Sequence, residues 1–274
     1  IPSEQEINSM TPMLRQYFSL KKDCIDCVLF FRMGDFYEIF GEDAQEVSQQ
    51  LDIVLTSRER GDKKRIPFCG VPHHSIDGYW AKLLRKNYKV AIADQVEEAK
   101  EAKGLVRREI VKILTPGCID EIEKLDSNSP NYIMAAYENP VERNWSLALS
   151  DISTGEMRSA CVSDFSEVFE YIQVFHPKEL LLRKFHHTMF SKYNDKLNYQ
   201  GPLLGYLNET ILRDQDTTNS IFYGTFSKYE KTVSKQERLI VAALLKHFIG
   251  LKINLSCFHS IKNLFDPEQV TLNE

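Results

Sequence analysis

Apolar positions in the first part of the chain follow two spacings, one typical of helices and one typical of strands. Helical spacing begins behind Thr11-Pro12, a good helix start because threonine caps the first turn and proline fits its first position. Val28–Met33 is a continuous apolar run that ends at Gly34, which predicts a buried strand. The same criteria predict helices at Glu42–Leu51 and Ser75–Lys86, and strands at Asp52–Ser57, Ile66–Val71, Lys89–Gln95 and Arg108–Leu114. Because strands and helices alternate, residues 1–117 are predicted to form an α/β domain.

The pattern changes after residue 117. Residues 118–130 are acidic and polar, and we interpret them as a linker. Strands are predicted next at Tyr132–Tyr137, Ser146–Asp151, Glu156–Val162 and Glu179–Leu182, with helices at Phe165–Phe175 and Gln236–Gly250. Asn194–Thr218 shows no clear period and is predicted to be mostly loop. We therefore expect a second α/β domain at 131–252 and the start of a third at 253–274.

The most informative segment is Arg32–Glu38, which carries two aromatic residues and a carboxylate after a glycine. Side chains alternate along an extended backbone, so Phe36 and Glu38 would share one face, about 7 Å apart, while Tyr37 points inward. A flat apolar side chain can enter an unstacked base step, and an acceptor beside it can read a base edge. Taken alone, the pattern fits a buried Phe36 better, because most phenylalanines lie in protein cores.

Charge is distributed unevenly along the chain, whose net charge is −5. Through residue 116, 18 basic residues balance 18 acidic ones, whereas the remainder carries 16 against 21. The balanced part gathers its cations at Arg58–Arg65 and Lys100–Lys112, and local patches of this kind set the affinity for phosphates. Either patch alone would more simply be a solvated loop. The candidates for contacts with a nucleic-acid backbone are Arg58, Lys63, Lys64, Arg107 and Arg108.

The cysteines and histidines do not suggest a metal site. Cys24-Ile-Asp-Cys27 is a lone pair without a second pair at zinc spacing, and adjacent histidines such as His73-His74 seldom chelate one ion. The six cysteines are scattered, which is typical of reduced thiols in a cytosol. No apolar run approaches the length of a membrane span, so we expect a cytoplasmic protein without membrane contact.

Several motifs occur in a characteristic order: Thr11-Pro12-Met13, Phe31–Glu38, Ile66–His74, Leu114–Gly117 and Leu147–Glu156. Together they resemble the N-terminal part of the MutS family of DNA mismatch-recognition proteins. The resemblance implies a mixed-sheet α/β mismatch-recognition domain, followed by an RNase H-like α/β connector domain. A chain that begins with Ile1 is then expected to be a piece of a longer bacterial protein.

The resemblance also assigns roles to residues of this chain. Phe36 would be the wedge inserted at a mismatch, Glu38 would hydrogen-bond to the displaced base, and Met33 and Tyr37 would support the wedge. The implied partners are mismatched double-stranded DNA and, through the connector, a MutL-type protein. The parent would be a homodimer, although this piece is expected to be monomeric.

We expect neither catalytic residues nor a cofactor in this part of such a protein. The phosphate-binding motif GxxxxGK[ST] is absent from the sequence, and the family places ATP and Mg²⁺ in a domain beyond its end. Two alternatives remain open at this point. Asp35 with Glu38, or Asp151 with Glu156, could serve a metal-dependent nuclease, which would need several converging carboxylates. The acidic second half could instead be a protein-interaction module only.

Overall fold

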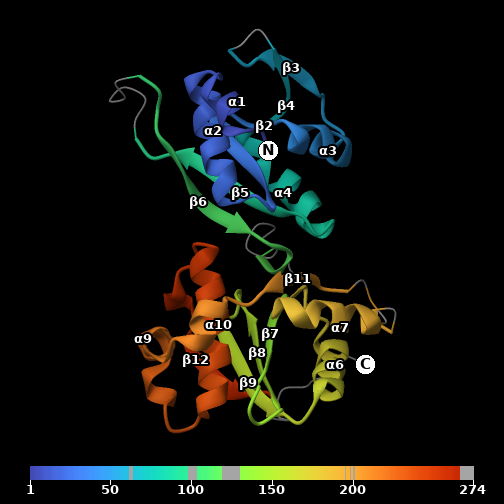
Figure 1. Cartoon of the computed structure of the whole chain (residues 1–274), viewed down its shortest axis with the longest axis vertical. Helices are drawn as coiled ribbons and strands as arrows, with labels where there is room; N and C mark the ends of the chain where they lie inside the picture. Colours follow the sequence, from blue (N-terminus) through green and yellow to red (C-terminus); the bar gives the residue numbers. More distant parts are fainter. Residues whose placement is uncertain are drawn as a thin grey trace. The chain divides into compact units, whose positions relative to one another are not determined.

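The computed structural model describes residues 1–61, 64–97, 104–118, 130–194, 196–197, 199 and 201–265. The chain divides into two compact units, Ile1–Lys124 and Leu125–Glu274 (Figure 1). Each unit contains one mixed sheet of six described strands with helices packed against it, which confirms the predicted class of two α/β domains. The predicted linker at 118–130 lies, apart from its two end residues, outside the described residues.

The first unit is built around the sheet order β3-β4-β2-β1-β5-β6. Its strands are β1 (Cys27–Met33), β2 (Phe36–Phe40), β3 (Thr56–Glu59), β4 (Arg65–Pro72), β5 (Lys89–Gln95) and β6 (Arg108–Leu114). Its helices are α1 (Glu4–Asn8), α2 (Pro12–Asp23), α3 (Glu42–Leu51) and α4 (Ile76–Arg85), with 3₁₀ turns at His73–Ser75 and Pro116–Cys118. Among these strands β1 and β5 pair in parallel, and the other neighbours are antiparallel.

Helix α2 anchors the central strands of this sheet. It begins as predicted, with the Thr11 side chain accepting a hydrogen bond from the Leu14 amide. The Tyr17 ring packs edge-on against Phe31 of β1 and Phe40 of β2, with ring centroids 5.6 and 4.9 Å apart. Helix α4 covers the opposite face through Trp80, which contacts the rings of Phe30 and Tyr37. Strand β2 is therefore held at Phe40 by α2 on one face of the sheet and at Tyr37 by α4 on the other.

One predicted strand of this unit begins later than expected. We predicted a strand from Asp52, but β3 starts at Thr56. Asp52 takes a left-handed conformation, with φ of 55°, and closes α3, while the Ile53 amide donates to the Ser48 carbonyl of the last helical turn. The helix therefore needs these residues for its C-terminal cap.

The second unit has the sheet order β11-β10-β7-β8-β9-β12. Its strands are β7 (Tyr132–Glu138), β8 (Trp145–Asp151), β9 (Glu156–Val162), β10 (Glu179–Leu182), β11 (Leu203–Tyr206) and β12 (Ser260–Asn263). Its helices are α6 (Phe165–Phe175), α7 (Lys184–Asn194), α8 (Glu209–Arg213), α9 (Gln215–Phe226) and α10 (Lys235–Gly250), with 3₁₀ turns at Ser227–Tyr229 and Leu255–Cys257. Strands β7, β8 and β9 form an antiparallel meander, and the outer strands add in parallel.

Two predictions for this unit are wrong. Asn194–Thr218 is not mostly loop, because it contains β11, α8 and the start of α9. The two helices begin at the polar caps Asn208 and Asp214 rather than at an apolar period. Residues 260–263 do not begin a separate domain. They form β12, which pairs with β9, and Ile261 and Leu264 are buried in the second unit.

Candidate nucleic-acid interface

The candidate wedge lies at the tip of the hairpin that joins β1 to β2. Met33 and Phe36 are cross-strand partners, so Gly34 and Asp35 form a two-residue turn. Gly34 has φ of +57°, a conformation that favours glycine at the first turn position. The His73 amide donates a 2.9 Å hydrogen bond to the Asp35 carbonyl oxygen, which ties the turn to the end of β4. The tip is therefore held in a defined conformation.

The predicted alternation along this strand is confirmed. Phe36 is 48% exposed, Tyr37 is 2% exposed, and the Glu38 side chain is 13% exposed. Phe36 and Glu38 are two residues apart on β2, so they share one face of the sheet. Met33, directly opposite Phe36, lies on that same face and is half-buried against the core. The roles assigned to these residues stay predictions.

Tyr37 is held from the opposite face of the sheet. Its hydroxyl donates a 3.0 Å hydrogen bond to Asp94 Oδ2, and its ring stacks on His73 at 5.7 Å between centroids. Burial, together with the Asp94 carboxylate, raises the pKa of Tyr37 to about 12, so the hydroxyl remains a donor at neutral pH. The residue behind the wedge is thus fixed by packing and by a hydrogen bond to a charged partner.

Glu38 is not a free acceptor. Arg58 Nη2 donates to Glu38 Oε1 at 3.1 Å, and Arg58 Nη1 lies 3.0 Å from Oε2. Burial raises the pKa of Glu38 above its usual value, while the guanidinium groups of Arg58 and then Arg108 oppose that rise. The Arg58 guanidinium also lies over the Phe68 ring, 4.3 Å from its centroid. Arg58 is therefore engaged with Glu38 and Phe68 on the face of the sheet, and its role as a phosphate contact stays a prediction.

The other predicted phosphate contacts differ in their availability. Arg108 is 6% exposed and donates to the Arg32 carbonyl at 2.5 Å and to Gln16 Oε1 at 3.1 Å. Its charge is thus buried against the sheet, which does not favour its predicted role as a phosphate contact. Arg107 is 66% exposed and pairs with Glu109 at 3.1 Å. Lys64 is exposed, and Lys63 lies outside the described residues.

Arg32 is a cation of this site that the sequence reasoning missed. Its Nε donates to the Gly34 carbonyl oxygen at 2.5 Å, and its guanidinium lies 5.4 Å from the centroid of the Tyr37 ring. A cavity of about 500 Å³ opens beside it, lined by Arg32, His73, Asp94, Gln95, Val96 and Glu97. The position of Arg32 in the sequence, directly before Met33-Gly34, was the signal that could have identified this cation.

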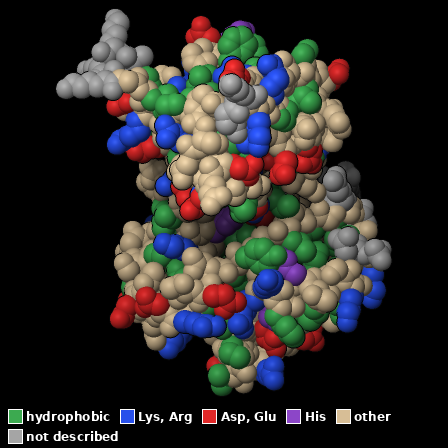
Figure 2. All heavy atoms as spheres, turned by 45° about the horizontal axis from the view of Figure 1, so that its top comes forward, with side chains coloured by type: hydrophobic (Ala, Val, Ile, Leu, Met, Phe, Trp, Pro, Cys, Tyr) green, Lys and Arg blue, Asp and Glu red, His purple; other side chains and the backbone are tan. Residues whose placement is uncertain are grey.

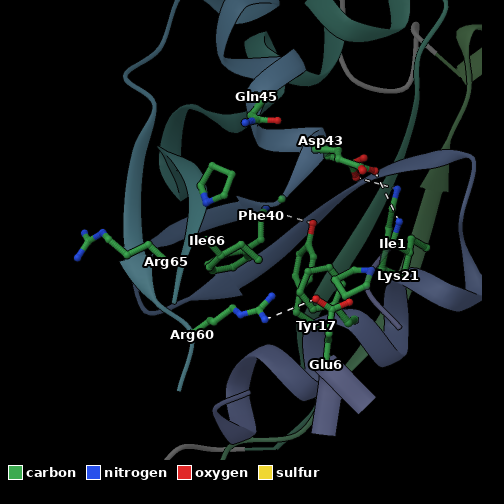
Figure 3. Close-up of a pocket in the computed structure, with 15 residues that line it drawn as sticks. Ile1, Glu6, Tyr17, Lys21, Phe40, Asp43, Gln45, Arg60, Arg65 and Ile66 are labelled. Atoms are coloured by element: carbon green, nitrogen blue, oxygen red, sulfur yellow. Dashed lines mark hydrogen bonds and ion pairs between the residues drawn. The ribbon is translucent and has the colours of Figure 1, made fainter. Parts of the chain in front are cut away.

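A second cavity of this unit, of about 420 Å³, lies among α1, α2, α3 and β4 (Figure 3). Four of the charged side chains on its wall form two ion pairs. Lys21 Nζ lies 2.7 Å from Asp43 Oδ2, and Arg60 lies 3.6 Å from Glu6. The first pair joins α2 to α3, and the second joins α1 to the residue that follows β3. Because these cations already have carboxylate partners, the cavity does not present a built anion site.

The structure does not favour the nuclease alternative. Asp151 Oδ1 accepts hydrogen bonds from the Ser153 amide and hydroxyl at 2.9 and 2.7 Å, so it caps the turn between β8 and β9. Glu156 Oε1 lies 3.0 Å from Lys262 Nζ. Within the described part of the chain, no three His, Cys, Asp or Glu side chains are grouped in a way that could hold a metal ion. Both carboxylates thus have structural partners.

Charged side chains of both signs are mixed on the part of the surface that Figure 2 draws, with Lys and Arg interspersed among Asp and Glu. None of the helices in the described residues combines the length and the apolar character needed to cross a membrane.

Comparison with known proteins bears on both units. Residues 11–123 match the family model of MutS domain I, and residues 131–248 match that of MutS domain II. The chain is 44% identical to the DNA mismatch repair protein MutS of Clostridium perfringens over 63% of its own length and 19% of that protein. It is 51% identical to the protein of the same name from Carboxydothermus hydrogenoformans over 57% of the chain and 18% of that protein.

A third relative extends across most of the chain. The DNA mismatch repair protein MutS of Syntrophomonas wolfei is 40% identical over 88% of this chain and 26% of its own length. The chain thus spans between 18% and 26% of the length of these three relatives. Two adjacent family domains, matched in order, and relatives of one name identify the chain as a member of the MutS family.

Proposed function

We propose that the first unit recognises mismatched or unpaired bases in duplex DNA by inserting Phe36, with Glu38 beside it on the same face. The observation that carries the proposal is the exposure of Phe36, 48%, at the tip of a fixed two-residue turn. A large apolar side chain exposed at a rigid tip suits insertion into another molecule better than it suits folding, because burial in the core would stabilise the chain.

The energetics explain why such a wedge responds to defects. Unstacking one base step costs a few kcal/mol, and stacking a base on an aromatic ring returns about 1–3 kcal/mol. For paired DNA these terms nearly cancel, so the wedge gains little. A mismatched or unpaired step is already weakened and costs less to open. Recognition then depends on the deformability of the duplex rather than on the identity of one base.

Glu38 adds a second criterion. A carboxylate near phosphates is repelled, so Glu38 would disfavour an intact duplex as much as it favours a displaced base. A base that leaves the stack offers N–H donors to the carboxylate, and a protonated Glu38 could donate to a base N7. The raised pKa of Glu38 supports this second possibility, because burial makes the neutral form easier to reach.

The wider role follows from the family. The relatives compared above are named DNA mismatch repair proteins, and we infer that this chain serves the same process. The second unit would relay the recognition event to a MutL-type partner and to an ATP-hydrolysing domain, within a homodimer associated with the nucleoid. The backbone contacts of the first unit would then come from Arg107, Lys64 and Lys63 rather than from Arg108.

The experiment compares Phe36→Ala with Phe185→Ala, a matched control that removes a 79% exposed phenylalanine from the second unit. Affinities for duplexes with a G·T mismatch, a single insertion or full pairing are measured by fluorescence anisotropy at low salt. We expect Phe36→Ala to lose its preference for the defects and to keep weak, salt-sensitive binding, while Phe185→Ala behaves like the parent. A Phe36→Ala protein that still prefers the mismatch would refute the wedge.

A further inference from the structure

The contact between Arg58 and Glu38 depends on a position on the face of the sheet that carries no side chain, Gly70. Glu38 of β2 pairs with Gly70 of β4, and Arg58 lies one strand further out on β3. A Cβ at Gly70 would lie 3.6 Å from Glu38 Cγ, so a longer side chain there would crowd the carboxylate. The Arg58 side chain passes over the Phe68 ring and reaches Glu38 where Gly70 contributes no side chain.

The pair is directional as well as charged. Two nitrogens of one guanidinium meet the two oxygens of one carboxylate, at 3.1 and 3.0 Å, and this fork fixes the plane and direction of the carboxylate. Glu38 Oε2 is buried, and the described residues provide it with no hydrogen bond besides this ion pair. Each carboxylate oxygen has two lone pairs, so the exposed side of Glu38 can still accept a base N–H while Arg58 stays in place.

We propose that Arg58 is a positioning residue for Glu38: it fixes the carboxylate beside Phe36 and keeps it ionised in the DNA-free protein. This inference rests on the proposed function of Glu38 at the mismatch. Among the described residues, the charged groups that face Glu38 are Arg58 on β3 and Arg108 on β6, while its cross-strand partners are the uncharged Phe31 and Gly70. Removing Arg58 leaves a mostly buried carboxylate with, of these two groups, only the more remote Arg108 to oppose its protonation.

The direct test follows the titration of Glu38 in the whole chain without DNA. Carbon-13 labelling of glutamate carboxyl groups reports each titration by NMR, and Glu38→Gln identifies the signal of interest. An adjacent guanidinium typically lowers a carboxyl pKa by about 1–3 units, so Arg58→Met should raise the midpoint of Glu38 by that amount. Arg58→Lys retains the charge and should move it by less than about one unit.

A matched control comes from the neighbouring strand. Arg65 of β4 is exposed and donates from Nε to Ser57 Oγ at 2.8 Å rather than to Glu38. Arg65→Met should leave the Glu38 titration unchanged. Arg58→Gln provides a second neutral variant with a polar side chain. In a Trp145→Phe background, the fluorescence of Trp80 shows for each variant that the first unit is folded. An unmoved Glu38 midpoint in a folded neutral variant at position 58 overturns the inference.

The second arm of the test measures how the preference for mismatched over matched DNA depends on pH. The ratio of matched to mismatched dissociation constants is recorded for the parent, Arg58→Met and Glu38→Gln. We expect the ratio to change at a higher pH in Arg58→Met than in the parent, and to be independent of pH in Glu38→Gln. A loss of structure alone would not move the pH at which this ratio changes. The proposed function fails if Phe36→Ala keeps its mismatch preference, whereas the inference alone fails if position 58 does not affect the pH profile.

Discussion

Replacing Tyr17 with phenylalanine tests how the structure holds the candidate wedge in place. The Tyr17 hydroxyl accepts a hydrogen bond from the Phe40 amide at 3.2 Å and donates a longer one, 3.5 Å, to the Leu29 carbonyl. Tyr17 is fully buried, and Phe40 is 2% exposed. Phe40 ends the strand whose other end carries Phe36, so this contact fastens the rear of the wedge strand to α2.

The magnitude follows from the group that loses its partner. Tyr17→Phe keeps the ring and its packing, but it leaves the buried Phe40 amide without its hydroxyl acceptor. An unsatisfied buried donor costs about 1–3 kcal/mol, and the long bond to Leu29 adds little. With a urea m-value of about 1.5 kcal/mol/M, the unfolding midpoint of the first unit should fall by roughly 0.7–2 M.

The assay uses the two tryptophans of the chain, Trp80 in the first unit and Trp145 in the second. In a Trp145→Phe background, fluorescence during urea unfolding reports the first unit through Trp80. Tyr79→Phe is the control, because the structure shows no hydrogen bond of its hydroxyl among the described residues, only Lys82 over its ring. If Tyr17→Phe and Tyr79→Phe unfold at the same urea concentration, the hydroxyl does not hold the wedge strand and the reasoning is refuted.

Three further outcomes are expected. Gly155→Ala should destabilise the second unit by more than about 3 kcal/mol, because the added Cβ would lie 2.0 Å from the Cys257 carbonyl oxygen and Gly155 has φ of +64°. Unfolding followed by the fluorescence of Trp145 measures this loss of stability. Arg107→Ala should lower the slope of log affinity against log salt by about one, whereas Arg108→Ala should lower stability instead. The folded-state pKa of Glu38 is raised, so protonation of Glu38 stabilises the fold at low pH. That contribution to stability is lost as pH rises through the raised pKa. Urea midpoints measured across pH 4–7 should therefore show the parent losing stability relative to Glu38→Gln.

The sequence predicted the local features of this chain well where one physical signal decides them. The Thr11 cap, the apolar run ending at Gly34 and the alternation through Phe36 to Glu38 all depend on neighbouring residues, and the structure shows them as predicted. β11 and α8 were missed because they are short: four or five residues do not establish a period.

The availability of the cations could not be predicted in the same way. Arg58 and Arg108 belong to basic clusters in the sequence, yet one is paired with Glu38 across β4 and the other is buried over the Phe31 ring. Both arrangements depend on the order β3-β4-β2-β1-β5-β6, which brings residues 20 and 76 positions apart in the sequence into hydrogen bonds. A basic cluster therefore predicts phosphate contact only after the partners across the sheet are known, and the contact with Glu38 is the basis of our proposal that Arg58 positions that carboxylate.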